Sequence, residues 1–201
     1  MTQQVSKVEQ FKEEASRAGA KLQELVGLQD IAPFIVNLAR QYGVNRVVIS
    51  SSPLAELAGL QHRLEKEGVT VTVVTATDSE ATQQRLRQAC AEADIGMSEA
   101  TTAISETGTL VIAGDDGSSR LVAVLPRFHI ILVDCQNIVA TMEEAIAKIK
   151  SVGSSPAKCV PTYVTYITGR NTTADIPGAI LARAQGPAEE HILLLDHQGM
   201  R

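Results

Sequence analysis

The chain has 201 residues, which is enough for one domain with a sizeable hydrophobic core. Hydrophobic residues make up an ordinary 44%, but only 3% are aromatic and none is Trp, so we expect a core of Val, Ile, Leu and Ala, which suits a parallel sheet. A net charge of -5 without a cluster of Lys and Arg argues against nucleic acid or an anionic membrane surface as a partner.

The cysteines and histidines do not form a recognisable metal site. Cys90, Cys135 and Cys159 are odd in number and widely spaced, which indicates neither a disulfide framework nor an iron-sulfur motif, so we expect no metal and no cofactor. His129 is the only histidine near the candidate site described below, and a lone histidine is more often structural than catalytic. No apolar run approaches bilayer-spanning length, and the first residues are polar rather than a leader. We therefore expect a cytoplasmic protein without membrane insertion.

The N-terminal segment predicts an amphipathic helix. Apolar residues recur at steps of three and four from Val8 to Leu25, which draws a narrow stripe along a polar helix. Either this stripe packs on its own domain or the helix docks on a partner subunit, which makes a homo-oligomer possible. We interpret residues 1–28 as a helical arm and residues 29–201 as an α/β domain.

Residues 30–100 predict helices and strands in alternation. The expected strands are 46–50, 69–76 and 95–100. The expected helices are 30–43, 53–68 and one beginning at a capping box of Thr77 and Glu80. Strand-helix units in series imply a parallel sheet covered by helices, and ligands bind such folds at the edge where the turns after the strands gather. Ser50-Ser51-Ser52 lies at this edge, although serine runs are more often turn residues than ligand contacts.

The stretch 101–113 is the least ordinary, because five hydroxyl residues and one carboxylate adjoin a fully apolar strand. Strand alternation places Glu106 on the same face as Ile104 and Leu110, so we expect it to be buried. A buried carboxylate must find donors or hold a proton. Gly108 lets the backbone bend or a ligand come close. The alternative is that Glu106 is a paired structural acid and that the hydroxyls satisfy turn amides.

The rest of the chain completes the predicted sheet. The apolar runs Leu110–Ala113 and Leu121–Leu125, joined by a turn over 114–119, predict a buried antiparallel hairpin. Later elements are strands over 129–134, 163–167 and 191–196, and a helix that begins at a capping box of Thr141 and Glu144. The elements predict a single three-layer α/β domain with a mainly parallel sheet and one antiparallel hairpin.

A second candidate stretch follows the strand over 163–167, where Gly169, Arg170 and several hydroxyl residues precede a short helix. Backbone amides at a helix N-terminus bind anions, so this loop is a candidate for binding a carboxylate or phosphate. The alternative is that Thr172 or Thr173 caps the helix and that Asp175 complements its dipole. The candidate ligand-binding residues are Ser105, Thr107, Gly108, Thr109, Gly169, Arg170, Thr172, Thr173 and Asp175, and Glu106 is the candidate catalytic base or nucleophile.

Several of these motifs resemble one known family. The motifs are Ala103–Val111, Leu125-Pro126, His129-Ile130, Gly169 with Thr173-Ala174-Asp175-Ile176, and Gly186-Pro187. They resemble the signature of the LUD-domain family, the family of lactate-utilization protein C. The resemblance implies a fold like that of NagB, RpiA and CoA transferases. It also implies an accessory subunit that binds a small anionic metabolite and works with iron-sulfur partners that oxidise L-lactate to pyruvate.

The same stretch supports an alternative function. Ser105-Glu106-Thr107-Gly108 is similar to the Ser-Glu-x-Gly around the nucleophilic Glu of one class of CoA transferases. This resemblance implies a stand-alone enzyme of acyl or CoA transferase type, or of sugar-phosphate isomerase type, with Glu106 as its reactive group.

Overall fold

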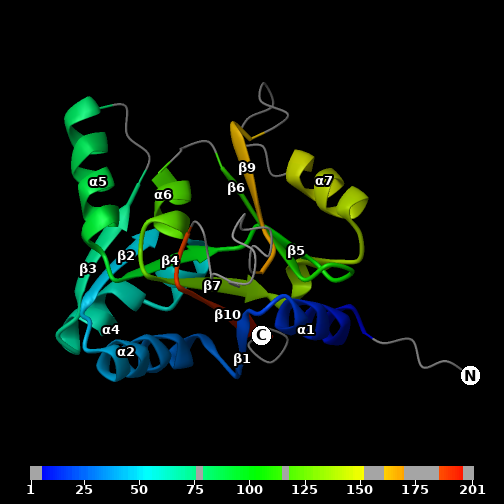
Figure 1. Cartoon of the computed structure of the whole chain (residues 1–201), viewed down its shortest axis with the longest axis horizontal. Coiled ribbons are helices and arrows are strands. Elements are labelled where there is room, and N and C mark those ends of the chain that lie inside the picture. The colour runs from blue at the N-terminus through cyan, green and yellow to red at the C-terminus, as the bar shows by residue number, and fades with distance from the viewer. Residues whose placement is uncertain (1–5, 76–78, 115–117, 152–160, 170–185, 197–201) are drawn as a thin grey trace, which may run out of the picture.

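The structure is a computed structural model that describes residues 6–75, 79–114, 118–151, 161–169 and 186–196. Its largest element is a six-stranded parallel sheet, sheet A, with the order β1-β10-β7-β4-β2-β3 (Figure 1). In that order the strands are Lys21–Leu25, Glu189–Leu195, Phe128–Asp134, Ile95–Glu99, Arg46–Ser50 and Thr70–Val74. The mainly parallel sheet expected from the sequence is confirmed.

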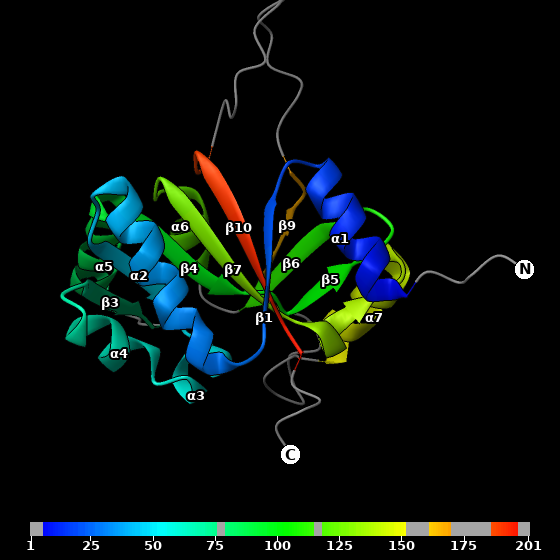
Figure 2. The same cartoon turned by 90° about the horizontal axis from the view of Figure 1, so that it is seen from below.

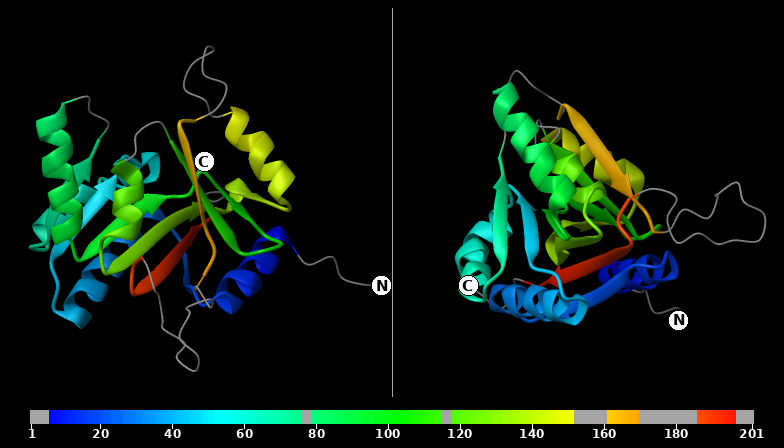
Figure 3. Two further views of the ribbon diagram at one scale, coloured as in Figure 1. Left: turned by 45° about the horizontal axis from the view of Figure 1, so that its top comes forward. Right: turned by 60° about the vertical axis from the view of Figure 1, so that its left-hand side comes forward.

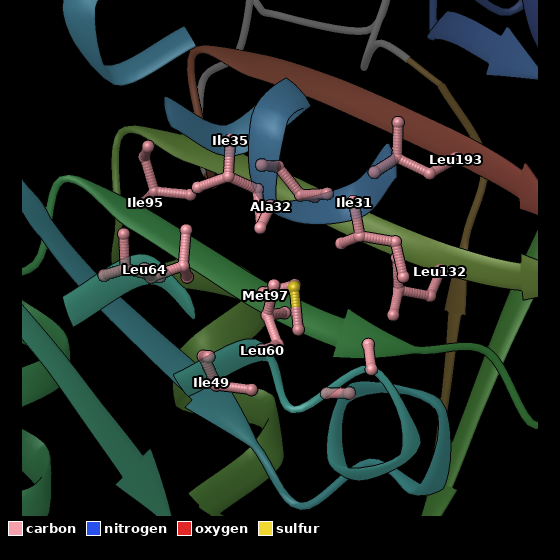
Figure 4. Close-up of a cluster of buried hydrophobic side chains, with 14 of the residues drawn as sticks. Ile31, Ala32, Ile35, Ile49, Leu60, Leu64, Ile95, Met97, Leu132 and Leu193 are labelled. Carbon is pink, nitrogen blue, oxygen red and sulfur yellow. The ribbon is translucent and has the colours of Figure 1, made fainter. Parts of the chain in front are cut away.

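Helices cover sheet A on both faces, as Figures 1 and 3 show. One face carries α2 (Ile31–Tyr42), α3 (Pro53–Leu57) and α4 (Leu60–Lys66), and the other carries α5 (Glu80–Glu92) and α6 (Ser118–Val124). The core under α2 to α4 is aliphatic, with Ile35, Leu64 and Met97 fully buried (Figure 4). The helix expected over 53–68 is divided in two at Gly59, whose φ of 55° interrupts the right-handed helix.

A second sheet, sheet B, is mixed and has the order β8-β5-β6-β9. In that order its strands are Ile138–Val139, Thr102–Ile104, Thr109–Gly114 and Tyr163–Ile167. Only β6 runs against its neighbours, so the carboxyl ends of β5, β8 and β9 lie at one edge. The α-helix α7 (Met142–Ser151) packs on this sheet, with Ala145 and Ile149 against Ile104 and Val111. One bond of the predicted capping box is present, because Glu144 N donates to Thr141 Oγ1 at 3.4 Å, but Glu144 Oε2 accepts from Ala140 N at 2.8 Å, one residue before the N-cap.

The structure has an antiparallel hairpin, but it is not the predicted one. β6 pairs with β5 around the Glu106 turn, whereas Leu121–Leu125 belongs largely to α6. A short apolar run does not distinguish a buried strand from a buried helix. Tertiary packing decides here: a Cβ added at Gly96 of β4 would lie 2.0 Å from the carbonyl oxygen of Val122, so only glycine lets α6 pack this closely.

The predicted N-terminal helix is wrong in its second half. α1 (Lys7–Arg17) is followed by Gly19, with φ of 94°, and the chain continues as β1, which pairs with β10 at the edge of sheet A. Phe11 and Ala15 of α1 are buried in a core that includes residues of both sheets. Figure 2 shows α1 beside β1. The apolar stripe therefore packs on its own domain. No helix in the described part of the chain is long and apolar enough to cross a membrane.

Candidate functional site

The predicted site residues that the structure describes lie at the carboxyl edge of sheet B. The turn after β5 contains Ser105, Glu106, Thr107 and Gly108, and the loop after β9 begins with Thr168-Gly169. These segments are brought together because β6 pairs with β5 on one side and with β9 on the other. Arg170, Thr172, Thr173 and Asp175 lie outside the described residues, so their predicted roles in ligand binding stay predictions.

A chain of three threonine hydroxyls links the two loops. Thr109 Oγ1 lies 2.7 Å from Thr107 Oγ1 and 2.7 Å from Thr168 Oγ1. Thr109 is 4% exposed, whereas Thr107 and Thr168 are exposed. Each of the three hydroxyls carries one proton, and the two hydrogen bonds between them require two of the three protons. If the bonds run in one direction, the third O–H points outward from Thr107 or Thr168, where it can donate to a bound acceptor.

Glu106 is exposed, so its predicted burial is wrong. The alternation of a strand stops at Ile104, because residues 105–108 form a turn in which Gly108 has φ of 64°. The carboxylate Oε1 accepts a hydrogen bond from the backbone N–H of Met142 at 3.2 Å, at the first residue of α7. This bond fits the structural reading, in which an acid complements the N-terminus of a helix. The exposure also leaves the carboxylate accessible, and a catalytic role stays a prediction.

The two glycines of the site make room for α1. A Cβ added at Gly108 would lie 2.3 Å from the backbone N of Ala15, and one added at Gly169 would lie 2.1 Å from the carbonyl oxygen of Ala18. Ser105, which is fully buried, donates to Gln10 Oε1 of α1 at 3.1 Å. The close approach expected at Gly108 is therefore made by the backbone of α1, and three of the predicted residues hold that helix in place.

His129 is not part of this edge. It is buried in β7 of sheet A, and its Nε2 lies 2.7 Å from Oγ of Ser98 on the neighbouring strand β4. Among the residues that the structure describes, no group of three or more His, Cys, Asp or Glu side chains is placed to hold a metal ion.

The sequence reading missed a pocket of about 420 Å³ at the carboxyl ends of β2 and β3. Its lining includes Ser50, Ser51, Ser52, Glu56, Gln61, His62 and Glu65 over a floor that includes Ile49, Leu60 and Val73. In sheet A the strand order reverses between β2 and β4, where open α/β sheets bind ligands; the pocket adjoins this point on the β3 side of β2, and no residue of β4 lines it. The serine run indicated this edge in the sequence. The residues between 56 and 65 line the pocket only because the chain breaks between α3 and α4, which the sequence did not predict.

Ser52 in that pocket is fixed by an acid that the sequence reading also missed. Its Oγ donates to Glu99 Oε2 at 2.7 Å and accepts from Ala55 N at 3.1 Å. The same carboxylate oxygen accepts from Leu54 N at 3.0 Å. The carboxylate of Glu99, at the end of β4, thus accepts the hydrogen bonds of two donors at the start of α3. This supports the interpretation of Ser52 as a turn residue rather than a ligand contact.

A family model for the LUD domain matches residues 8–195, nearly the whole chain. The chain belongs to the LUD domain family. The resemblance seen in the sequence motifs is therefore confirmed. A solved structure of a DUF162 family protein from Deinococcus radiodurans superposes on this LUD domain with a TM-score of 0.60 and 19% identity, covering 95% of this chain and 99% of that one. At this identity the match supports the fold alone, and it agrees with a single α/β domain.

Curated relatives of this LUD domain are lactate utilization proteins. It is 26% identical over 153 residues to lactate utilization protein C of Halalkalibacterium halodurans, covering 76% of this chain and 64% of that protein. It is 27% identical over 150 residues to lactate utilization protein C of Bacillus subtilis, covering 74% and 62%. It is 28% identical over 116 residues to lactate utilization protein B of Shouchella clausii, covering 57% and 23%. The matched segment thus spans less than two thirds of each of these relatives.

Proposed function

We propose that this LUD domain functions in lactate utilization, as an accessory subunit that works with iron-sulfur partners oxidising L-lactate to pyruvate in the cytoplasm. The names of its relatives, lactate utilization proteins B and C, support this role. The chain has three cysteines, fewer than the four thiolates that commonly hold an iron-sulfur cluster, so we assign the redox centre to the partners. Association with a second copy of this chain is a further expectation.

The role of the domain in such a system is to bind a small anionic metabolite at the carboxyl edge of sheet B. The observation that carries this proposal is the chain of hydroxyls from Thr107 through Thr109 to Thr168, which leaves one O–H to donate outward when both bonds run in one direction. Arg170 follows Gly169 directly in the sequence and would supply the positive charge. A hydroxyl donor and a guanidinium together bind carboxylates, and the carboxylate of a 2-hydroxy or 2-keto acid such as L-lactate or pyruvate fits these donors.

Growth and binding measurements test this proposal together. A strain without the gene should not grow on L-lactate, and the wild-type gene should restore growth. Thr107→Ala and Arg170→Ala should weaken binding of L-lactate or pyruvate by about tenfold each, measured by calorimetry. Thr70→Ala, on the exposed edge strand β3 of the other sheet, is the control and should leave binding unchanged. Growth of the deletion strain at the wild-type rate would rule out the lactate role.

The accessible carboxylate of Glu106 favours a second candidate, a stand-alone acyl or CoA transferase. In that reaction the carboxylate attacks the thioester carbonyl, the CoA thiolate leaves, and an acyl-glutamyl anhydride forms. Incubation with acyl-CoA would then release free thiol in one equivalent and label Glu106, as detected by mass spectrometry. The lactate proposal predicts neither product, so this assay separates the two functions.

A further inference from the structure

The two edge strands of sheet A differ in how they are protected from pairing with another chain. β1 carries the charged residues Lys21 and Glu24, both in ion pairs, and α1 lies against it. β3 consists only of threonine and valine, and its five residues pair one-to-one with β2 without a bulge. Proteins usually guard an open strand edge with charges, a proline, a bulge or a covering element. β3, at the end of sheet A opposite β1, has none of the first three (Figure 2).

The backbone groups on the outer side of β3 have no partner among the described residues. Thr70 N donates to the carbonyl oxygen of Asn45, immediately before β2, at 2.8 Å, so the backbone groups of Thr70 point toward β2. Because this direction alternates along a strand, Thr72 points the same way, whereas Val71 and Val73 point outward. No hydrogen bond within the described part of the chain reaches these outward N–H and C=O groups. The edge therefore offers donors and acceptors in alternation.

This pattern of donors and acceptors is complementary to itself. When two copies of β3 run antiparallel, Val71 of one copy lies opposite Val73 of the other, and each such pair exchanges an N–H···O bond in both directions. Thr72 then faces Thr72 of the second copy across the two-fold axis, and Thr–Thr is a favourable cross-strand pair. Since β3 carries no charged side chain, two copies bring no like charges into opposition along the strand.

The side chains and helices beside β3 also leave this edge open. Val73, on the face of the sheet that α4 covers, is 37% exposed, and Val71 of a second copy would cover it and bury apolar surface. On the other face, α5 shares a core with Val74 of β3, yet Cys90 is the only buried residue of its 13. The outer surface of α5 is therefore free to meet the same helix of a second copy.

From these observations we propose that two copies of this chain associate through β3, so that their six-stranded sheets join into one continuous sheet. The two β3 strands run antiparallel, with Thr72 of each copy at the two-fold axis. This interface gives a location to the association with a second copy that is expected above. It does not depend on the lactate or the transferase proposal, because its tests use the purified chain without ligand and without a growth assay.

Disulfide trapping tests the position of the two-fold axis. In a Cys159→Ser background, Thr72→Cys places two thiols at a non-hydrogen-bonded antiparallel pair, where the Cα atoms are about 4.5 Å apart and a disulfide can form. Thr70→Cys is the matched control, because position 70 would lie opposite Val74 of the second copy rather than opposite itself. Thr70 is also the more exposed residue, so random collision would favour the control.

Both variants are oxidised with glutathione disulfide, and the products are separated by non-reducing electrophoresis and identified by mass spectrometry. We expect a covalent dimer of Thr72→Cys that reduction reverses, and little or none of Thr70→Cys. Equal dimer yields for the two variants, or no dimer of Thr72→Cys, would overturn the proposed pairing.

Two variants of Val73 separate association from folding. Val73→Pro removes only an outward N–H that β2 does not use, and proline is tolerated at such positions of an edge strand. Val73→Lys keeps every backbone group and adds a charge of the kind that guards natural edges. In sedimentation equilibrium we expect wild type to dimerise as its concentration rises, and each variant to raise the dissociation constant of the dimer at least about tenfold.

Circular dichroism checks that each variant keeps the wild-type fold, and two substitutions at one position guard against a variant that does not fold. Wild type that stays monomeric at every concentration, or a folded variant that dimerises as tightly as wild type, would overturn the proposal. A wild-type monomer that instead binds an added β-strand peptide at this edge would assign the edge to a different partner and would overturn it as well.

Discussion

Gly108 has two constraints that a side chain would violate. Its φ of 64° is left-handed, and the backbone of Ala15 occupies the position of a Cβ. We expect Gly108→Ala to lower the free energy of unfolding by ~1 kcal/mol for the conformation and by a further ~1–3 kcal/mol for the clash. Gly43→Ala is a matched control, because Gly43 has φ of 66° and no atom within 4 Å of the added Cβ. If urea unfolding gives equal losses of unfolding free energy for both variants, the close packing of α1 against this turn would be contradicted.

Variants of Glu106 test whether this residue contributes to stability, to activity or to both. Glu106→Gln keeps an oxygen that can accept from Met142 N, so we expect a loss of less than ~1 kcal/mol in unfolding free energy, whereas Glu106→Ala should cost ~0.5–2 kcal/mol. Glu144→Gln is the control, since Glu144 bonds Ala140 N at the same end of α7. If Glu106 is catalytic, Glu106→Gln should abolish acyl transfer, or growth on L-lactate, without changing the melting temperature relative to wild type. Normal function in this variant would leave only the structural role.

The cysteine thiols described by the structure should react slowly. Burial raises the pKa of Cys90 to about 11, and burial together with nearby acids, Asp196 first among them, raises that of Cys135 to about 11. Because the thiolate is the reactive form, we expect little modification of either residue by a disulfide reagent at pH 8 in a Cys159→Ser variant. Both should react quickly after denaturation in urea. Fast labelling of the native variant would show that one of the thiols is accessible.

At the scale of elements, β1 is held at the edge of sheet A by side chains as well as by backbone pairing. Lys21 Nζ donates to Glu189 Oε2 at 2.7 Å, and the hydroxyl of Tyr42 at the end of α2 donates to Glu189 Oε1 at 3.0 Å. Burial alone would raise the pKa of Glu189, but hydrogen bonds from Lys21, Tyr42 and His191 outweigh it and hold the pKa below its ordinary value. The hydrogen bonds that lower the pKa of Glu189 therefore stabilise the folded state when the carboxylate is ionised.

This interaction predicts a pH-dependent stability. A depressed carboxylate pKa contributes stability above the unfolded value, near ~4.3, and the contribution is lost as the pH falls through the folded pKa. We expect Glu189→Gln to lower the free energy of unfolding by ~1 kcal/mol at pH 7 and by progressively less below pH 4. Glu67→Gln removes an exposed partner of Arg40 and should show a smaller effect at pH 7. A difference between wild type and Glu189→Gln that grows on acidification would be the wrong sign.

For the whole molecule, the sequence predicts elements best where local signals and tertiary packing agree. The strands over 46–50 and 163–167 match their predicted bounds, and α2 ends at Gly43, whose φ is positive. The strand Lys21–Leu25 and the helix Ser118–Val124 were missed, because their conformations depend on partners distant in the chain: β10 for the first and Gly96 for the second.

Only the part of the candidate site that local sequence signals determine was predicted. Ser105, Thr107, Thr109 and Gly169 do meet at one sheet edge, because strong strand signals on both sides of each loop place them there. Glu106 was misplaced because the alternation of a strand was extended through a turn. The pocket beside β2 joins residues of four elements, and no spacing within the sequence encodes that contact.

The pairing of β1 with β10 also has a consequence for synthesis of the chain on the ribosome. Lys21 and Glu189 are 168 residues apart, and α1 shares its buried core with Ile192 and Leu194 of β10. β1 therefore has nothing to pair with until β10 has been translated, and closing so long a loop is slow. Until then β7 is an open strand edge and Phe11 lacks the part of its core that β10 supplies, features that chaperones and proteases recognise in unfinished chains. A message truncated before the codon for Glu189 would thus yield a product that lacks β10 and cannot pair β1, so one end of sheet A would be missing, which marks it for removal.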